Sequence, residues 1–447
     1  MQGCLPHTFR KLIYTMAASE NPSSEQSEPV FDSPGENEGP QTENFQSDPL
    51  SEDSKKTMDD LLNEAVQVAG AEEAPRLTRT VRPPGPGLFE SIFWLIGVIL
   101  AHFAGMIVFL FGFFALLMAT NQLPDTSAEM REQLTGLTET HTLELAGVEQ
   151  GVFVFIVIAA VALRFGKGVL SKLNLQPFAV STGFLLLICV LPLSMLSGEF
   201  YRIAYGIWTG FAEQIPWLQQ FDKMQTMEIV KDMAEKSSLW ALVLVIAVCP
   251  AIGEELVFRG AIGRGLLARW GLIPGILITS VMFGIVHMHP AHAIAVIPLG
   301  MFMHFVYVVT KSFWAPVLVH FLNNAFAVTV AKMMSQFPEN AAKLGDESQS
   351  VHPLITLAAV AFLIVVCLYL WKTRVRYIKP NGGEWTPGYL SNEKPPAGAP
   401  ITMERSTAAA GFYPGLAVLF VNFLAMMYLF GMEPEAEAGF LHFITAF

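Results

Sequence analysis

Charged side chains are scarce in this chain. Of its 447 residues only 15% are Asp, Glu, Lys or Arg, whereas 52% are hydrophobic, including 34 Phe and 20 Met. A soluble protein averages roughly 25% charged residues, so this composition excludes a soluble fold and indicates a polytopic membrane protein. No basic patch is available to bind nucleic acid, and much of the acid behind the net charge of -12 lies in the N-terminal part and in loops.

Cysteine is scarcer still. The chain has four, which lie far apart in the sequence: Cys4, Cys189, Cys249 and Cys367. The last three fall within apolar runs, where a thiol usually behaves as a small hydrophobic side chain. We therefore expect neither disulfides nor a cysteine metal site.

Large apolar side chains are few in residues 1–88, which are rich in Ser, Glu, Pro, Asn and Gln. Such a segment buries too little apolar surface to offset the entropy of ordering, so we expect a disordered tail with room for one short helix near residues 59–71. The first residues also lack the apolar core of a signal peptide. We expect the tail to remain attached.

Apolar runs long enough to cross a bilayer, roughly 20 residues each as helices, begin at residue 89. They predict an all-α polytopic transmembrane bundle over residues 89–372, a turn-rich linker over 373–410 and an additional C-terminal span within 411–447. The second run is the weakest by length. The nine candidate spans are residues 90–120, 151–166, 178–197, 238–258, 272–288, 292–310, 314–331, 353–371 and 411–431.

The breaks between these spans alternate in charge, which predicts how the chain is oriented. Cytoplasmic loops carry the excess of Lys and Arg, and such residues gather after the second, fourth and eighth spans, whereas the loops at 121–150 and 332–352 carry more acid than base. We expect a cytoplasmic N-terminal tail, an external C-terminus and a place in the plasma (inner) membrane. The basic residues are Arg164, Lys167, Lys172, Arg264, Arg269, Lys372, Arg374, Arg376 and Lys379.

Three ionisable residues interrupt the fourth apolar run, in the sequence Gly-Glu-Glu-Leu-Val-Phe-Arg. A charge at membrane depth costs roughly 2.5–3.5 kcal/mol on insertion scales, so Glu254, Glu255 and Arg259 indicate a functional site. Residues four apart share a helix face, so Glu255 and Arg259 can form an ion pair. Glu254 remains the free carboxylate, able to take a proton from water and return it to a leaving amine. The alternative is a buried ion-pair network that only orients helices.

His287 lies in the next apolar run, 33 residues after Glu254 (287 − 254 = 33). Midway between them, at Trp270 and Gly271, we predict a turn that joins a helix over residues 238–269 to a returning helix. At a rise of 1.5 Å per residue, the acid and the imidazole would each lie roughly 24 Å from this turn. At one depth they can share one water molecule.

His320 and Asn324 are again four apart, so they line one face of the seventh run. Such polar groups face the bundle interior, where they can polarise a scissile carbonyl and stabilise the oxyanion that forms when water attacks. The structural alternative is interhelical hydrogen bonding, worth about 0.6 kcal/mol in membranes. His304 is a weaker candidate for the same cavity, and we expect His289 and His292, which flank Pro290, at the membrane interface.

A metal centre is an alternative role for the same side chains. Two His and one Glu are a known catalytic zinc set with an open position for water, and here they would be Glu254, His287 and His320. The usual His-Glu-x-x-His signature is absent from the sequence. The residues alone leave open whether a divalent metal such as zinc is held or whether these side chains act directly on water.

Three motifs occur in order on successive spans within residues 238–331. They are Glu254-Glu255-x-x-x-Arg259, Phe283-x-x-x-His287 and His320-x-x-x-Asn324. As an ordered set they resemble those of the CAAX protease and bacteriocin-processing (CPBP) family of membrane peptidases. The resemblance implies an eight-helix core, to which the long tail and the ninth span are additions.

The same resemblance implies roles for the motif residues and a class of substrate. Glu254 would be the base, His287 would orient the water, and His320 with Asn324 would form the oxyanion site, supported by the remaining glutamate and arginine of the first motif. The substrate would be a membrane-associated peptide or lipidated protein. In the Ras-converting branch of eukaryotes, the reaction removes the last three residues after a prenylated cysteine.

Two functions of other classes compete with a peptidase. A non-catalytic membrane scaffold or bacteriocin-immunity protein would keep the fold without the reaction. A secondary transporter would use the carboxylates as proton carriers, but transporters commonly contain corresponding broken helices in two halves, and no such pair is visible here.

Overall fold

The computed structural model describes residues 85–224, 226–336, 351–406 and 412–430. The predicted disordered tail falls almost wholly outside these residues, as does the helix predicted near residues 59–71.

Helices account for most of the described chain. Seven of them are long and apolar enough to cross a membrane, and two shorter apolar helices, Leu272–Ile285 and Tyr413–Leu429, occupy the fifth and ninth predicted runs. The prediction of an all-α polytopic bundle is therefore confirmed. The helices outside the fourth run are α3 (Leu88–Ala119), α4 (Ser127–Thr140), α5 (Thr142–Phe165), α6 (Val169–Leu173), α7 (Val180–Gln214), η2 (Pro216–Met224), α8 (Thr226–Lys236), α12 (Leu272–Ile285), α13 (Pro290–Thr310), α14 (Trp314–Gln336), α16 (Pro353–Lys372) and α17 (Phe412–Phe430).

The helix predicted over residues 238–269 is one helical stretch from Leu239 to Trp270. The chain then turns at Gly271, whose φ of 80° lies in the left-handed region that glycine adopts without strain. The predicted turn and returning helix are thus confirmed. The stretch consists of α9 (Leu239–Leu242), the π-helix η3 (Val243–Val248), α10 (Cys249–Glu255), the π-helix η4 (Leu256–Gly263) and α11 (Arg264–Trp270).

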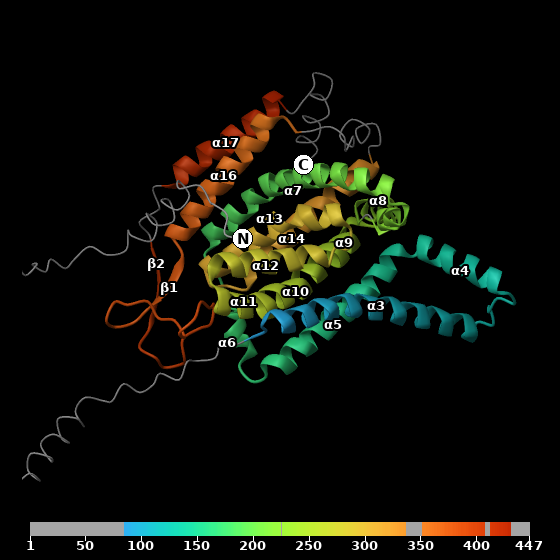
Figure 1. The fold of residues 1–447 in the computed structure, drawn as a ribbon, viewed down its shortest axis with the longest axis horizontal. Helices are drawn as coiled ribbons and strands as arrows, with labels where there is room; N and C mark the ends of the chain where they lie inside the picture. Colours follow the sequence, from blue (N-terminus) through green and yellow to red (C-terminus); the bar gives the residue numbers. More distant parts are fainter. Residues whose placement is uncertain (1–84, 225, 337–350, 407–411, 431–447) are drawn as a thin grey trace, which may run out of the picture. The chain divides into compact units, whose positions relative to one another are not determined.

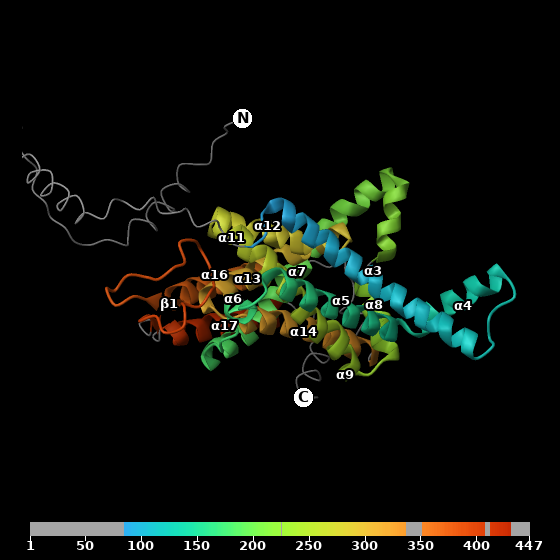
Figure 2. The same cartoon turned by 90° about the horizontal axis from the view of Figure 1, so that it is seen from below.

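This interrupted helix lies in the middle of the bundle. Together with α12, α13 and α14 it lies between the pair α3 and α5 on one side and the pair α16 and α17 on the other (Figures 1 and 2). The helix α12 packs along α13, and α13 packs against α7. A continuous cluster of buried apolar side chains joins these helices, and residues 253–267 of the fourth run are buried.

The stretch predicted as a linker is folded. It forms the antiparallel strands β1 (Val375–Ile378) and β2 (Thr402–Arg405). Between the strands, the side chain of Asn392 donates a hydrogen bond to the carbonyl oxygen of Tyr307 on α13, at 2.6 Å. These contacts fix the segment against one end of the bundle.

The helices α3 and α5 approach closely at Gly105, where an added Cβ would lie 2.4 Å from the Cα of Glu149. Backbone atoms cannot yield as a side-chain tip can, so we expect Gly105→Ala to separate the helices and lower the free energy of unfolding by about 1–3 kcal/mol. Thermal unfolding in detergent measures this loss. Gly112→Ala on the same helix is the matched control, because nothing lies within 4 Å of its added Cβ; equal unfolding temperatures would contradict the close contact.

Candidate active site

The two glutamates of the first motif end α10, between the π-helices η3 and η4. Turns of π-helix are rare and occur frequently at functional sites. Glu254 is 9% exposed and Glu255 is fully buried. The two glutamates therefore lie where the backbone differs from that of an ordinary membrane helix.

Glu255 forms the ion pair that its spacing from Arg259 predicts. The Nη1 atom of Arg259 donates to Oε1 of Glu255 at 2.7 Å, and both side chains are fully buried. The Nη2 atom donates to the carbonyl oxygen of Gly300 on α13, at 2.7 Å, and the guanidinium lies 5.0 Å from the ring centroid of Phe283 on α12. The arginine thus joins the central helix to both of its neighbours.

His320, on α14, lies between the two carboxylates. Its Nδ1 atom is 2.9 Å from Oε1 of Glu255, and its Nε2 atom is 3.9 Å from Oε2 of Glu254. That Oε2 atom is buried and has no hydrogen-bond partner among the described residues. The Oε2 atom of Glu255 is likewise buried without a partner among these residues, but its Oε1 atom is bound by both Arg259 and His320. Glu254 has no such hydrogen bond in the described chain and lies next to an imidazole.

His287 lies in the short turn that follows α12. Its Nδ1 atom is 3.0 Å from the carbonyl oxygen of Phe283, and because a carbonyl only accepts, Nδ1 must carry the hydrogen and Nε2 is left as an acceptor. The ring of Phe283 stands edge-on to His287, with centroids 5.1 Å apart, and edge-on to His320, at 5.8 Å. The two imidazoles therefore flank one aromatic ring and lie within electrostatic reach of each other.

Asn324 lies one helical turn beyond His320 on α14. Its Nδ2 atom donates to the carbonyl oxygen of Ile246 in η3, at 3.0 Å. A side-chain amide has two hydrogens, so this bond fixes the side chain and leaves the second hydrogen for another acceptor.

Two further histidines lie away from this cluster. His304 is fully buried against Gly263, where an added Cβ would lie 2.1 Å from its Cε1 atom, and neither ring nitrogen has a partner in the described part of the chain. His289, which we expected at the membrane interface, is fully buried within the protein. The reason is the long helix α7, whose Tyr201, Tyr205 and Trp208 rings lie 5.8–6.4 Å from its imidazole.

Asp222 of η2 completes this cover over the turn that carries His287. It accepts a hydrogen bond from Nε1 of Trp208 at 2.8 Å and lies 3.4 Å from Nε2 of His289. Asp222→Ala leaves both groups without this partner, so we expect a loss of about 1–3 kcal/mol in the free energy of unfolding, read from thermal unfolding in detergent. Asp232→Ala is the control, because its ion pair with Lys236 is exposed and contributes little. A smaller loss from Asp222→Ala than from the control would show that the contacts of Asp222 with Trp208 and His289 do not stabilise the fold.

Two polar residues that were not predicted from the sequence border the site. His102 on α3 lies 3.0 Å, through Nδ1, from Oε1 of Glu149 on α5. Its ring stacks on Phe153, with centroids 4.2 Å apart and planes 18° from parallel. His102 is an ionisable side chain within a predicted span. Because such a residue indicates a functional site, as at Glu254, the sequence contained a signal for it.

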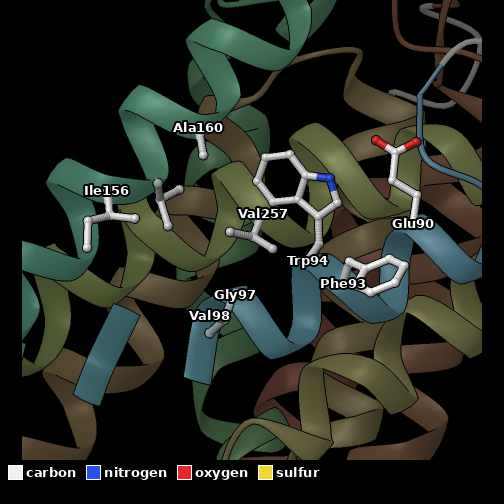
Figure 3. A pocket seen from close by; sticks show the side chains of 9 residues that line it. Glu90, Phe93, Trp94, Gly97, Val98, Ile156, Ala160 and Val257 are labelled. Carbon is white, nitrogen blue, oxygen red and sulfur yellow. The ribbon is translucent and has the colours of Figure 1, made fainter. Parts of the chain in front are cut away.

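An apolar pocket of about 290 Å³ lies next to the site, between α3, α5 and η4. Trp94 projects from α3 toward it, and Glu90 lies at one end (Figure 3). Three valines that line it lie four residues, or about one helical turn, from residues at the site. The pairs are Val98 with His102, Val157 with Phe153, and Val257 with Gly253. The pocket thus adjoins the polar site on three helices at once.

The residues do not form a metal centre as the structure places them. In the described ranges, no three His, Cys, Asp or Glu side chains are grouped closely enough to hold an ion. Glu254 and His320 are neighbours, whereas His287 and His320 each stand edge-on to the ring of Phe283. The zinc set considered from the sequence, Glu254, His287 and His320, does not fit this arrangement.

Fold and site together define a multi-pass membrane protein with a buried acid and imidazole centre. Residues 236–326 match the family described as Type II CAAX prenyl endopeptidase Rce1-like. A Bacillus subtilis (strain 168) protein described as "Putative membrane peptidase YdiL" is 33% identical over 87 residues, which cover 20% of this chain and 36% of that protein. These matches confirm the CPBP resemblance for this segment, which contains all three motifs. No solved structure matches the chain significantly.

Proposed function

We propose that the chain is an intramembrane endopeptidase that hydrolyses a peptide bond of a membrane-associated substrate. The observation that carries this proposal is the position of His320 inside a bundle of membrane helices, between Glu255, which Arg259 pairs, and Glu254, which makes no hydrogen bond to the described residues. A buried carboxylate with one free oxygen is suited to remove a proton from water. The match of this segment to a peptidase family supports the same reaction.

In the proposed mechanism, Glu254 and the Nε2 atom of His287 hold the attacking water. Glu254 takes one proton, and the hydroxyl oxygen attacks the scissile carbonyl carbon. The oxyanion that forms receives hydrogen bonds from His320 and from the second amide hydrogen of Asn324. Glu255 keeps His320 in place through Nδ1.

The proposed substrate is a protein or peptide that carries a lipid, with a prenylated CAAX sequence as the specific candidate. The name of the matching family suggests this class, and the apolar pocket beside the polar site supports it. Its volume of about 290 Å³ lies just below the range of about 300–1,000 Å³ that is common for protein pockets holding small ligands. We also propose the plasma (inner) membrane as the location, and from the charges of the loops we propose that the N-terminus lies on the cytoplasmic side.

Cleavage of defined peptides tests the proposal. The full chain, purified and placed in lipid nanodiscs, is given a farnesylated peptide ending in Cys-aliphatic-aliphatic-X and the same peptide without the lipid. We expect mass spectrometry to detect release of the last three residues, faster from the farnesylated peptide. Equal cleavage rates would show that the enzyme does not recognise the lipid of the substrate. A folded protein that cleaves neither peptide would contradict the peptidase function.

A further inference from the structure

The polar pair His102 and Glu149 lies outside the three motifs and has no role in the mechanism above. Both side chains are only part-buried, at 24% and 32% exposure, yet they belong to spans whose other polar groups are few. The contact of Nδ1 with a carboxylate fixes one ring nitrogen. The other, Nε2, makes no hydrogen bond to the residues that the structure describes.

Helix geometry places His102 at the depth of Glu254. The start of α3 lies beside the end of α11 in space. The evidence is a hydrogen bond of 3.2 Å from Nη1 of Arg269 to the carbonyl oxygen of Pro86. His102 is 14 residues into α3 (102 − 88 = 14), and Glu254 is 16 residues from the end of α11 (270 − 254 = 16). At 1.5 Å per α-helical residue, His102 is about 21 Å from that end of the bundle. Glu254 is at most about 24 Å from it, because the π-helix η4 rises less per residue than an α-helix.

The neighbours of His102 also place its imidazole beside the part of the central helix that carries Glu254. His102 stacks on Phe153, and the edge of Phe153 lies 2.5 Å from the position of a Cβ added to Gly253, the residue before Glu254. His102 is close enough to interact electrostatically with Glu254 of α10 and with His287 after α12. Glu149, on α5, is the charged group in direct contact with it.

We propose that His102, held by Glu149, is the general acid that protonates the leaving amine. This inference rests on the proposed peptidase function. An imidazolium whose Nδ1–H is bound by a carboxylate presents Nε2–H as a directed proton donor, an arrangement that acid–base catalysis uses repeatedly. His102 would be a catalytic residue and Glu149 its positioning residue.

The proton balance of the step is complete. One proton of the water passes to Glu254 as the new C–O bond forms, and the C–N bond then breaks with its electron pair going to nitrogen. That nitrogen takes the Nε2 proton of His102. The proton on Glu254 then passes to His102 through water, so that both groups return to their starting state, and the other water proton stays with the new carboxyl group.

A substrate whose leaving group needs no proton distinguishes a general acid at position 102 from a residue that only supports the structure. A thioester in place of the scissile amide releases a thiol, whose ordinary pKa is about 8.5, so it leaves as a thiolate. We expect His102→Gln to lower kcat for the amide peptide roughly 100-fold with little change in KM, and to cleave the thioester peptide at nearly the wild-type rate. Glu149→Gln should have the same selectivity with a smaller effect.

The controls distinguish this proposal from the peptidase function itself. His141→Gln alters an exposed pair with Glu144 and should change neither rate, whereas Glu254→Gln should abolish both. If His102→Gln and Glu149→Gln slow both peptides equally, or slow neither, the general-acid role is overturned while the peptidase function stands. A wild-type protein that cleaves neither peptide overturns the function and this inference together.

Discussion

Glu254→Gln should reduce peptide cleavage by at least 100-fold while leaving the protein folded. The amide keeps the size of the carboxylate but cannot accept the proton of the attacking water, and removing such a base typically costs 10²–10⁴-fold in rate. Because Oε2 of Glu254 is buried without a partner in the described chain, replacing a buried charge with a neutral amide should not lower stability. The expected result is a large loss of kcat with an unfolding temperature equal to or above that of the wild type.

The matched control is Glu235→Gln, the same substitution at an exposed position on α8. It should leave both the rate and the unfolding temperature unchanged. Retained activity in a purified Glu254→Gln protein would show that Glu254 is not the general base. An equal loss of activity and stability would instead make Glu254 a residue that only supports the packing of the bundle.

Arg259→Met should produce the largest loss of stability. The substitution leaves the fully buried Glu255 without its ion pair and the Gly300 carbonyl without its donor. Breaking a buried pair from one side typically costs about 3–5 kcal/mol, because an uncompensated charge remains. We expect a correspondingly lower unfolding temperature in detergent, together with a loss of activity because Glu255 also holds His320.

Two comparisons make this prediction specific. Arg164→Met breaks another arginine–glutamate pair, with Glu90, but these side chains are 42% and 37% exposed, so the loss should be at most about 1 kcal/mol. In a double variant, Glu255→Leu with Arg259→Met, no unpaired charge is left, and stability should recover in part. If Arg259→Met is no worse than Arg164→Met, the buried pair does not hold the bundle together.

Much of the central hairpin could be predicted from the sequence. The apolar run, the turn at Gly271 and the pairing of Glu255 with Arg259 all depend on local spacing, which a single helix determines without reference to the rest of the fold. The structure contains each of them. The assignment of catalytic roles to the motif residues stays a prediction.

Other features depend on tertiary contacts that no local pattern encodes. The π-helices on both sides of α10 leave no signature in the apolar periodicity. The direction of Asn324 toward the carbonyl of Ile246 depends on how α14 packs on η3. His102 precedes Glu254 by 152 residues (254 − 102 = 152), so only the packing of α3 on α5 brings it to the site.

The most direct measurement of the central claim, that Glu254 activates a water molecule, is a single turnover in water labelled with oxygen-18. With enzyme in excess over a farnesylated peptide, mass spectrometry follows the new carboxyl group of the product and the tryptic peptide that contains Glu254. The proposed mechanism predicts one labelled oxygen in the product after this first turnover and none in Glu254. An unlabelled product together with label in Glu254 would contradict it, because the carboxylate would then have attacked the peptide itself.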